Sequence, residues 1–250
     1  MTPIEISSQS TMDATMQPSL FYPAKGKKRP LLVGLHTWST DRYNQIENML
    51  PFALENDFHL LLPEFRGPNT LENPDRTQAC GSVYARCDIK DAIDYAVLHW
   101  DVDTENIFLL GLSGGGHMAL LMAGFCPEYF KAIGAFVPIT DLGLWAKQSA
   151  DYRERILTCC SHSEEELLSR SPISYVDTIA KANLKIFHGK YDALVPVTHS
   201  LELFQRVFER YPKSRVFLDI FDGGHEIDMK SASYWILSNY TGTNKVAVTG

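Results

Sequence analysis

The chain has 250 residues, 45% hydrophobic and 21% charged, which suits a globular protein with a sizeable core and argues against disorder. The formal net charge of −7 leaves no basic face for nucleic acid, since the single basic cluster, KGKKR at 25–29, is typical of a solvated turn. No window reaches the ~18 apolar residues of a membrane span and the N-terminus lacks the order of a secretory signal, so we predict a cytoplasmic protein.

Apolar runs of strand length alternate with helical patterns along most of the chain. RPLLVGLHTW (29–38) and FHLLLPEF (58–65) are too continuously apolar for half-exposed strands, and indicate strands buried on both faces. The other predicted strands are 107–112, 132–139, 184–189 and 215–221, and the predicted helices are 87–100, 114–125, 197–211 and 229–240. The alternation predicts one α/β domain over 1–250, with a mostly parallel central sheet and helices on both faces.

One segment departs from the alternation. Residues 141–180 carry helical patterns and no strand pattern. Ser163 and Glu166 fit a capping box, so the acidic run SEEE is expected to start a helix and not to bind a metal. We therefore predict a small helical cap over one edge of the sheet, within the same domain.

The cysteines and the remaining motifs give no sign of a cofactor. Five cysteines form no CxxC pair, and an odd number cannot all be bridged internally: Cys80, Cys87, Cys126, Cys159 and Cys160. Reduced thiols are expected, although the spacing of Cys80 and Cys87 allows a bridge. No H-E-x-x-H motif and no phosphate-binding glycine loop occurs, so neither a metal nor a cofactor is predicted. The sequence does not decide between a monomer and a homo-oligomer.

The stretch IFLLGLSGGGHMALLMAG (107–124) places a serine between a predicted strand and a predicted helix. Residues 111–115, GLSGG, match G-x-S-x-G, and the strand–turn–helix context distinguishes a nucleophile elbow from a chance match. Neighbours two residues either side of Ser113 must be small, because a Cβ there would strike the turning chain. The tight turn is expected to expose the Ser113 hydroxyl, with the Gly114 N–H facing an oxyanion at the helix N-terminus. The alternative is that the glycines only let the helix pack closely on the strand.

A serine hydroxyl needs a base, and the base needs an orienting acid. Asp192 follows the predicted strand 184–189, and His225 follows the strand 215–221, in the order Ser…Asp…His. Both strand ends lie at the same edge of a parallel sheet as Ser113. Among the competitors, His188 lies within a strand and is expected to be a satisfied core residue, and Asp222 is too near His225 along the chain.

The motifs GLSGGGHMAL, SPISYVDTI, LKIFHGKYDALVPVTHSLEL and DGGHE together resemble the catalytic domain of the prolyl oligopeptidase family and its short esterase relatives, within the α/β-hydrolases. The resemblance runs from about residue 29 to residue 240 and implies an α/β-hydrolase fold. It departs from the family at His36-Thr37-Trp38, where glycine usually follows the histidine. By position in the family motif, the Trp38 N–H is the second oxyanion donor, against the alternative that its indole belongs to the core.

These residues predict a serine hydrolase that acts through an acyl-enzyme. Peptidases of the family carry an additional propeller domain, for which 250 residues leave no room, so a carboxylesterase for short acyl esters on carbohydrates or small alcohols is the first hypothesis. A small peptidase or amidase is the second, and a non-catalytic binding module the third. Trp145 and Tyr152 of the cap are candidates for a substrate pocket, or for ordinary cap packing. Arg66 is a candidate for an ion-pairing structural residue, which the sequence alone does not decide.

Overall fold

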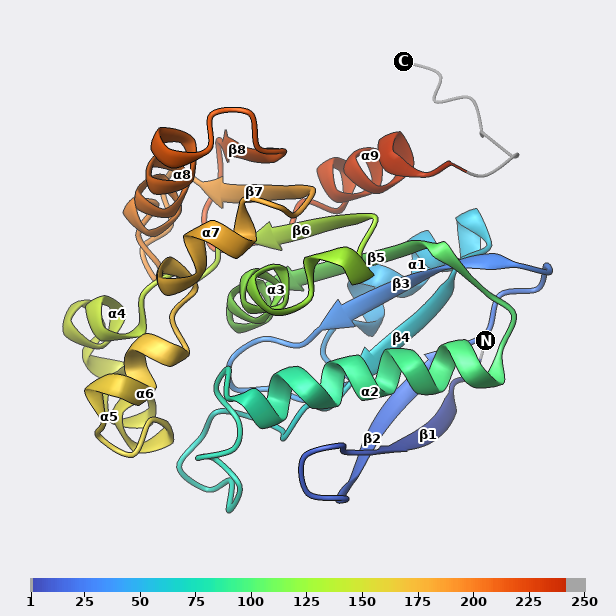
Figure 1. Cartoon of the computed structure of the whole chain (residues 1–250), viewed down its shortest axis with the longest axis horizontal. Coiled ribbons are helices and arrows are strands. Elements are labelled where there is room, and N and C mark those ends of the chain that lie inside the picture. The colour runs from blue at the N-terminus through green and yellow to red at the C-terminus, as the bar shows by residue number, and fades with distance from the viewer. Residues whose placement is uncertain (1, 242–250) are drawn as a thin grey trace.

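The computed structural model describes residues 2–241, which form one eight-stranded sheet in the order β1-β2-β4-β3-β5-β6-β7-β8 (Figure 1). Its strands are β1 (Ile4–Gln9), β2 (Met16–Tyr22), β3 (Arg29–Leu35), β4 (His59–Pro63), β5 (Val102–Leu112), β6 (Ala132–Phe136), β7 (Leu184–Gly189) and β8 (Val216–Phe221). The strands from β3 to β8 pair in parallel, whereas β1 and β2 form an antiparallel hairpin at one edge. The α/β class and the mostly parallel sheet predicted from the sequence are confirmed.

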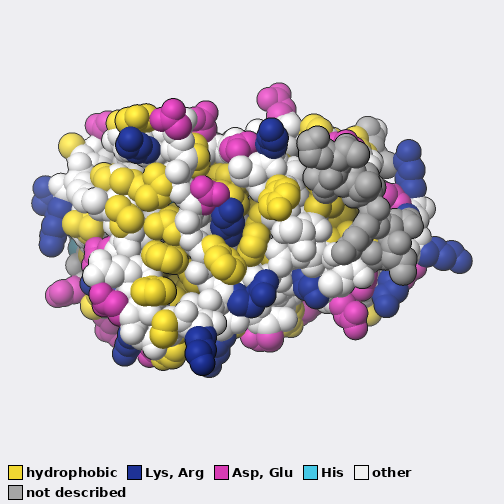
Figure 2. Space-filling model, turned by 90° about the horizontal axis from the view of Figure 1, so that it is seen from above, with side chains coloured by type: hydrophobic (Ala, Val, Ile, Leu, Met, Phe, Trp, Pro, Cys, Tyr) yellow, Lys and Arg dark blue, Asp and Glu magenta, His cyan; other side chains and the backbone are white. Residues whose placement is uncertain are grey.

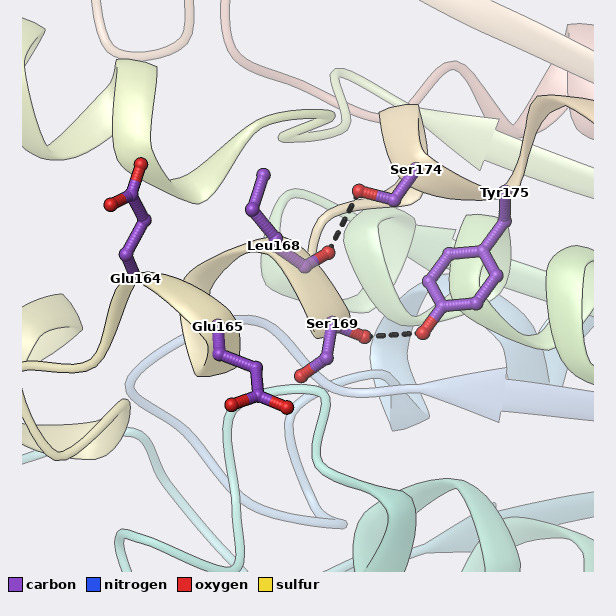
Figure 3. A pocket seen from close by; sticks show the side chains of 6 residues that line it. All are labelled: Glu164, Glu165, Leu168, Ser169, Ser174 and Tyr175. Carbon is purple, nitrogen blue, oxygen red and sulfur yellow. Dashed lines mark hydrogen bonds between the residues drawn. The ribbon is translucent and has the colours of Figure 1, made fainter.

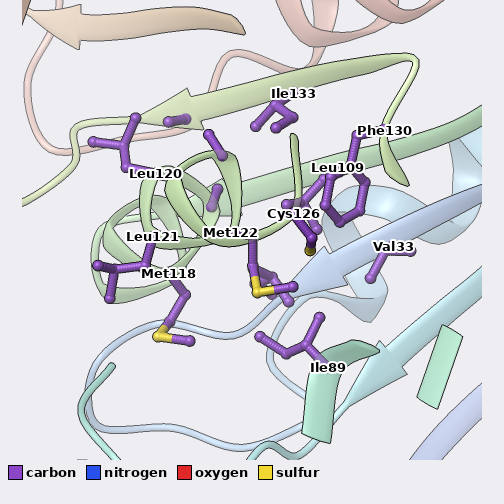
Figure 4. Close-up of a cluster of buried hydrophobic side chains, with 14 of the residues drawn as sticks. Val33, Ile89, Leu109, Met118, Leu120, Leu121, Met122, Cys126, Phe130 and Ile133 are labelled. Carbon is purple, nitrogen blue, oxygen red and sulfur yellow. The ribbon is translucent and has the colours of Figure 1, made fainter. Parts of the chain in front are cut away.

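Helices cover both faces of the sheet. They are α1 (Ile46–Asn56), α2 (Val83–His99), α3 (Gly114–Phe125), α4 (Leu142–Gln148), α5 (Ala150–Cys159), α6 (Glu164–Ser169), α7 (Val176–Ile179), α8 (Thr198–Arg210) and α9 (Met229–Asn239). Side chains of α2, α3 and α8 share one buried cluster with alternate residues of the strands, and those of α1 and α9 share a second cluster on the opposite face. Figure 4 shows the first cluster around α3, where Met118 and Met122 pack near Ile89 and Val33.

Three elements before residue 60 were not predicted: β1, β2 and α1. Side chains of β1 alternate between exposed and buried, so the strand carries little apolar signal. Pro18 lies within β2, and Pro51 lies inside α1, where a proline ordinarily ends a helix.

The hairpin of β1 and β2 is joined to α2 through Arg66, whose guanidinium pairs with Asp88 at 2.5 Å and with Asp13 at 2.8 Å. Arg66 is therefore a buried structural ion-pair residue.

The segment 141–180 contains α4, α5, α6 and α7 and no strand, and the first three lie beside the carboxyl ends of the parallel strands (Figure 1). The Ser163 hydroxyl accepts from the Glu166 N–H at 3.3 Å, so the predicted helix start is confirmed. A third buried cluster joins the cap to loops at the end of the sheet and includes Cys80, Cys159 and Cys160. All five cysteines are free, so no bridge joins Cys80 to Cys87.

β8 is the edge strand farthest from the hairpin, and apolar side chains remain exposed along it. Phe217 is 42% exposed and Ile220 is 44% exposed. Figure 2 views the molecule from this side, where hydrophobic side chains gather among scattered charges. Lys185 of β7 and Asp219 of β8 form an ion pair at 2.8 Å. Asp219 therefore lies within a strand and pairs with a lysine on the surface of the sheet.

Buried histidines make the stability of this fold sensitive to pH. His117 of α3 is fully buried, with Nε2 2.7 Å from the Arg170 carbonyl oxygen, to which it donates. Burial lowers the pKa of His117 to about 4, and also lowers the pKa of His199 to about 4. The unfolded chain, with a histidine pKa of about 6.5, binds protons first as the pH falls. The folded state therefore loses stability from about pH 6.5 down to about pH 4.

We expect His117 alone to make the free energy of unfolding about 1–2 kcal/mol lower at pH 5 than at pH 7. His117→Gln keeps an N–H donor near the position of Nε2 and removes the titrating ring, so it should flatten the pH dependence by that amount and leave the share of His199. Urea unfolding at the two pH values measures the difference. An unchanged pH dependence in the variant would show that His117 is not one of the responsible groups.

Candidate active site

Ser113 lies at the turn between β5 and α3. Its backbone has φ 57° and ψ −116°, a left-handed conformation that costs a non-glycine residue free energy, and the Ser113 N–H is anchored to the Phe136 carbonyl at 2.9 Å. The flanking glycines are sterically required. A Cβ on Gly111 would lie 2.0 Å from the Gly115 oxygen, and one on Gly115 would lie 2.3 Å from the Leu35 oxygen. The turn therefore has the geometry that a G-x-S-x-G elbow needs.

Asp192 lies in the loop after β7 with a fully buried side chain. One carboxylate oxygen, Oδ1, accepts from the N–H groups of Leu194 at 2.8 Å and Val195 at 2.9 Å. The other, Oδ2, is 2.7 Å from Nδ1 of His225. Burial raises the pKa of the Asp192 carboxyl, but hydrogen bonds from His188, His225 and Val195 outweigh burial and hold that pKa well below its usual value. The carboxylate is ionised at neutral pH.

His225 lies in the loop after β8, and its side chain is 23% exposed. Because an ionised carboxylate only accepts, the hydrogen bond to Asp192 assigns a proton to Nδ1 and leaves the Nε2 lone pair free to act as a base. The two loops approach closely because β7 ends in glycine: a Cβ on Gly189 would lie 2.1 Å from the Gly224 oxygen. In the part of the chain that the structure describes, the Ser113 hydroxyl makes no hydrogen bond to His225. Such bonds often form only in the substrate complex.

The backbones of Gly114 and Trp38 lie close together. A Cβ on Gly114 would be 2.5 Å from the Trp38 nitrogen, and within residues 2–241 neither N–H donates to a protein acceptor. Thr37 does not have a positive φ, so this backbone does not require the glycine usual in the family motif. The preceding His36 holds the turn: Nδ1 lies 2.9 Å from the backbone carbonyl oxygen of Thr37, and Nε2 lies 2.8 Å from the backbone carbonyl oxygen of Glu64. Two backbone donors without a protein acceptor among the described residues therefore lie close to the turn that carries Ser113.

A methyl group at Gly114 tests this pair of donors. Gly114→Ala should push the Trp38 backbone away and lower kcat by roughly 10²–10³-fold, the usual cost of one oxyanion donor. Because the displaced atoms are backbone, the melting temperature should fall as well, and the higher helix propensity of alanine, about 1 kcal/mol, offsets only part of that cost. Steady-state kinetics together with a melting curve checks both expectations. Gly143→Ala, where the nearest atom is an Asp141 oxygen at 3.4 Å, is the matched control and should keep its activity.

Trp38, Trp145 and Tyr152 form an aromatic group between the cap and the sheet. Trp145 is 1% exposed and meets the Trp38 ring edge-on, with ring centres 5.0 Å apart. Its indole N–H donates to the Leu194 carbonyl at 3.1 Å, so Trp145 also fastens the loop that carries Asp192. Tyr152 stacks on Trp145 at 4.7 Å and is only partly buried. Of the two predicted pocket residues, Tyr152 retains an accessible surface and Trp145 lies behind it.

His188 is a site neighbour whose contact with Asp192 was not predicted. The expectation that it is buried and satisfied holds, because it is 0% exposed and both ring nitrogens are hydrogen-bonded. The structure adds that Nε2 lies 3.5 Å from Asp192 Oδ2. The position of His188 near the carboxyl end of the strand, four residues before Asp192, is the sequence signal that points to this contact.

The surface of the cap has a shallow cavity of about 540 Å³, separate from these residues. Figure 3 shows its lining: Glu164, Glu165, Leu168, Ser169, Ser174 and Tyr175. The Tyr175 hydroxyl donates to the Ser169 carbonyl at 2.6 Å, and the Ser174 hydroxyl donates to the Leu168 carbonyl at 2.9 Å. Its hydroxyl groups are therefore engaged in holding the cap together.

Residues 2–241 contain no cluster of three or more His, Cys, Asp or Glu side chains arranged to hold a metal ion. None of the helices in this range combines the length and the apolar character needed to cross a bilayer.

A sheet of this order, with an elbow after β5 and an acid and a histidine after β7 and β8, is the α/β-hydrolase fold. Solved structures share it: a puromycin-hydrolyzing peptidase from Mycobacterium tuberculosis superposes with a TM-score of 0.77 at 17% identity, over 94% of this chain and 38% of that chain. The sequence model of the prolyl oligopeptidase family (Peptidase_S9) matches residues 81–241. The chain belongs to the prolyl oligopeptidase family.

Curated relatives differ in their described activities. Sequence identity is 28% over 145 residues to "Inactive dipeptidyl peptidase 10" of Rattus norvegicus (58% of this chain, 18% of the relative). It is 25% over 217 residues to "Acylamino-acid-releasing enzyme 2" of Oryza sativa subsp. japonica (80% and 27%), and 27% over 113 residues to "Acetylxylan esterase" of Coprinopsis cinerea (42% and 28%). The matches thus span less than a third of the length of each relative.

Proposed function

We propose that the chain is a serine hydrolase in which Ser113 is the nucleophile, His225 the base and Asp192 the orienting acid. The observation that carries the proposal is the 2.7 Å contact between Asp192 Oδ2 and His225 Nδ1, formed from two strand-end loops at the same sheet edge as the Ser113 elbow. The low pKa of the Asp192 carboxyl supports the same roles, since an ionised carboxylate stabilises the imidazolium that forms during the reaction.

The proposed reaction is acyl transfer to water. Ser113 Oγ attacks the substrate carbonyl while its proton passes to His225 Nε2, and the Gly114 and Trp38 N–H groups donate to the resulting oxyanion. Collapse of this intermediate breaks the bond to the leaving group, which takes the proton from His225, and Ser113 is left acylated. Water then attacks the acyl group by the same route and releases the acid and the free serine.

Carboxylic esters are the proposed substrates, with short acyl groups on carbohydrates or small alcohols. An ester carbonyl is less stabilised by resonance than an amide carbonyl, and the alcohol of an ester is a better leaving group than an amine. Ester cleavage therefore has a lower activation barrier than amide cleavage. Similarity to an acetylxylan esterase supports the choice. We place Tyr152 beside the acyl group, with Trp145 behind it as the support for both Tyr152 and the Asp192 loop.

A peptidase or amidase acting on short substrates is the second candidate. It is favoured by the acylamino-acid-releasing relative from rice, whose similarity extends over 80% of this chain. A non-catalytic binding module is the third candidate, since one relative is described as inactive.

A fluorophosphonate probe and a substrate panel test the proposal. The protein should be labelled by the probe. It should hydrolyse p-nitrophenyl esters with acyl groups of about two to four carbons faster than N-acyl-aminoacyl or prolyl p-nitroanilides. Comparable kcat/KM on the anilides would favour the peptidase. Absence of labelling and of turnover in a folded sample would overturn the proposal and favour the binding module.

A further inference from the structure

The loop that carries Asp192 is held from beneath by His188 of β7. His188 Nε2 lies 2.8 Å from the Val195 carbonyl oxygen, and Nδ1 lies 2.7 Å from Ser200 Oγ at the start of α8. A carbonyl only accepts, so Nε2 must carry a proton whichever state Nδ1 adopts. The same N–H lies 3.5 Å from Asp192 Oδ2, the oxygen that accepts from His225. Ser200 and His188 are both fully buried, so water does not compete for these bonds.

Val195 is held through both of its backbone polar groups. Its carbonyl accepts from His188, while its N–H donates to Asp192 Oδ1 at 2.9 Å. A closed ring of polar contacts results, running from His188 to Val195, to one oxygen of Asp192, and from the other oxygen back to His188. Rotation of the Asp192 carboxylate out of the plane that serves His225 would break bonds at both of its oxygens.

We propose that His188 is a positioning residue for the catalytic acid: anchored by Ser200, it holds the 192–195 loop so that Asp192 Oδ2 faces His225 Nδ1. The inference rests on the proposed serine hydrolase chemistry, because it concerns the orientation of the acid in that triad. His188 touches neither substrate nor the reacting atoms, and acts only through Asp192 and Val195. A histidine that merely tied α8 to the sheet would need the contact with Ser200, but not those with Val195 and Asp192.

His188→Leu and His188→Gln test the proposal as a pair. Leucine removes the donor, and kcat per active site should fall about 10²-fold, the scale of a misplacement near 1 Å in a reacting group. KM should change little, because His188 does not contact the substrate. Glutamine offers an N–H near the position of Nε2 and should restore most of the turnover. The downfield proton resonance of the His225–Asp192 bond should be shifted or lost in the leucine variant and kept in the glutamine variant.

His59→Leu is the matched control. His59 is also buried and accepts from the Ala24 N–H at 3.0 Å, but it begins β4, at the end of the parallel strands opposite to the proposed triad. The loss of this histidine should lower the melting temperature and leave kcat per active site unchanged. Titration with the fluorophosphonate counts functional serines in each sample, so partial unfolding does not pass for slow turnover.

The outcomes separate the two proposals. A wild-type protein that does not react with the fluorophosphonate refutes the serine hydrolase itself. A reactive wild type, with His188→Leu equal to it in kcat per titrated serine, refutes only the positioning role. If His188→Leu does not fold, Ser200→Ala decides, because it removes just the hydroxyl that anchors the ring. A reduced kcat together with a shifted or lost resonance of the His225–Asp192 proton supports the positioning role. Wild-type values of both refute it.

Discussion

Replacing Ser113 with alanine is expected to abolish fluorophosphonate labelling and to lower kcat by on the order of 10⁶-fold. The physical reason is that no other group at this turn can form the acyl bond, whereas the oxyanion donors and the binding surface remain. The fold should be unaffected. The Ser113 side chain makes no hydrogen bond among residues 2–241, and alanine has the same Cβ, so the backbone strain at φ 57° is unchanged. Fluorophosphonate labelling, steady-state turnover and a melting curve, taken on one preparation, measure the loss of the nucleophile, the fall in kcat and the unchanged stability.

Ser39→Ala is the matched control for this experiment. Ser39 is exposed and follows Trp38 in the loop that supplies the second proposed oxyanion donor, so it tests an incidental hydroxyl near the site. Its labelling and kcat should equal those of the wild type. Mass spectrometry of the labelled wild type should place the adduct on the peptide that contains Ser113. An adduct on any other serine, or normal labelling of Ser113→Ala, would remove Ser113 as the nucleophile.

The tight turn at Ser113 and the placement of Asp192 beside His225 could be predicted because each has a local steric or topological cause, whereas the catalytic roles of these residues stay predictions. Gly111 and Gly115 are required by backbone atoms within 2.3 Å of where their Cβ would lie, and such a requirement is written in the sequence as glycine. Asp192 and His225 follow continuous apolar runs, and the carboxyl ends of parallel strands meet at one edge. The pairing of Asp192 with His225 then needed only that topology.

Other features could not be predicted because their causes are not local. The role of Trp145 depends on which face of α4 meets the sheet, and a helical pattern alone does not say whether an aromatic residue lines a pocket or supports a loop. The acceptability of Thr37 depends on a backbone φ that is set by the bonds of His36 to Thr37 and Glu64. The cytoplasmic location and the single-domain organisation over 1–250 remain predictions.

β7 shows how one strand end serves two partners of the proposed site. His188 uses its ring to hold Val195 and to face Asp192. Gly189, the next residue, has no side chain, so the Gly224 carbonyl and the loop that carries His225 can approach it. The adjacent residues point to opposite faces of the strand, and together they set the relative placement of the acid and the base.

Asp192→Asn should lower kcat by about 10⁴-fold, as expected when an imidazole is held in the wrong tautomer. The bonds around the side chain dictate the outcome. Both N–H groups that face Oδ1 are donors, so the amide oxygen must take that position and the NH₂ group must point at His225 Nδ1. Nδ1 then accepts a hydrogen bond, the ring proton moves to Nε2, and no lone pair is left to receive the proton of Ser113.

Asp222→Asn provides the comparison, since this exposed carboxylate lies three residues before His225 and is an alternative acid close to it along the chain. Its kcat should match that of the wild type. Because tautomer exchange leaves the substrate surface intact, KM of Asp192→Asn should stay close to the wild-type value while kcat falls. Raising the pH should recover little of the lost rate, because the asparagine cannot regain a charge. A fall of less than tenfold in Asp192→Asn, or a large fall in Asp222→Asn, would assign the orienting acid to another carboxylate.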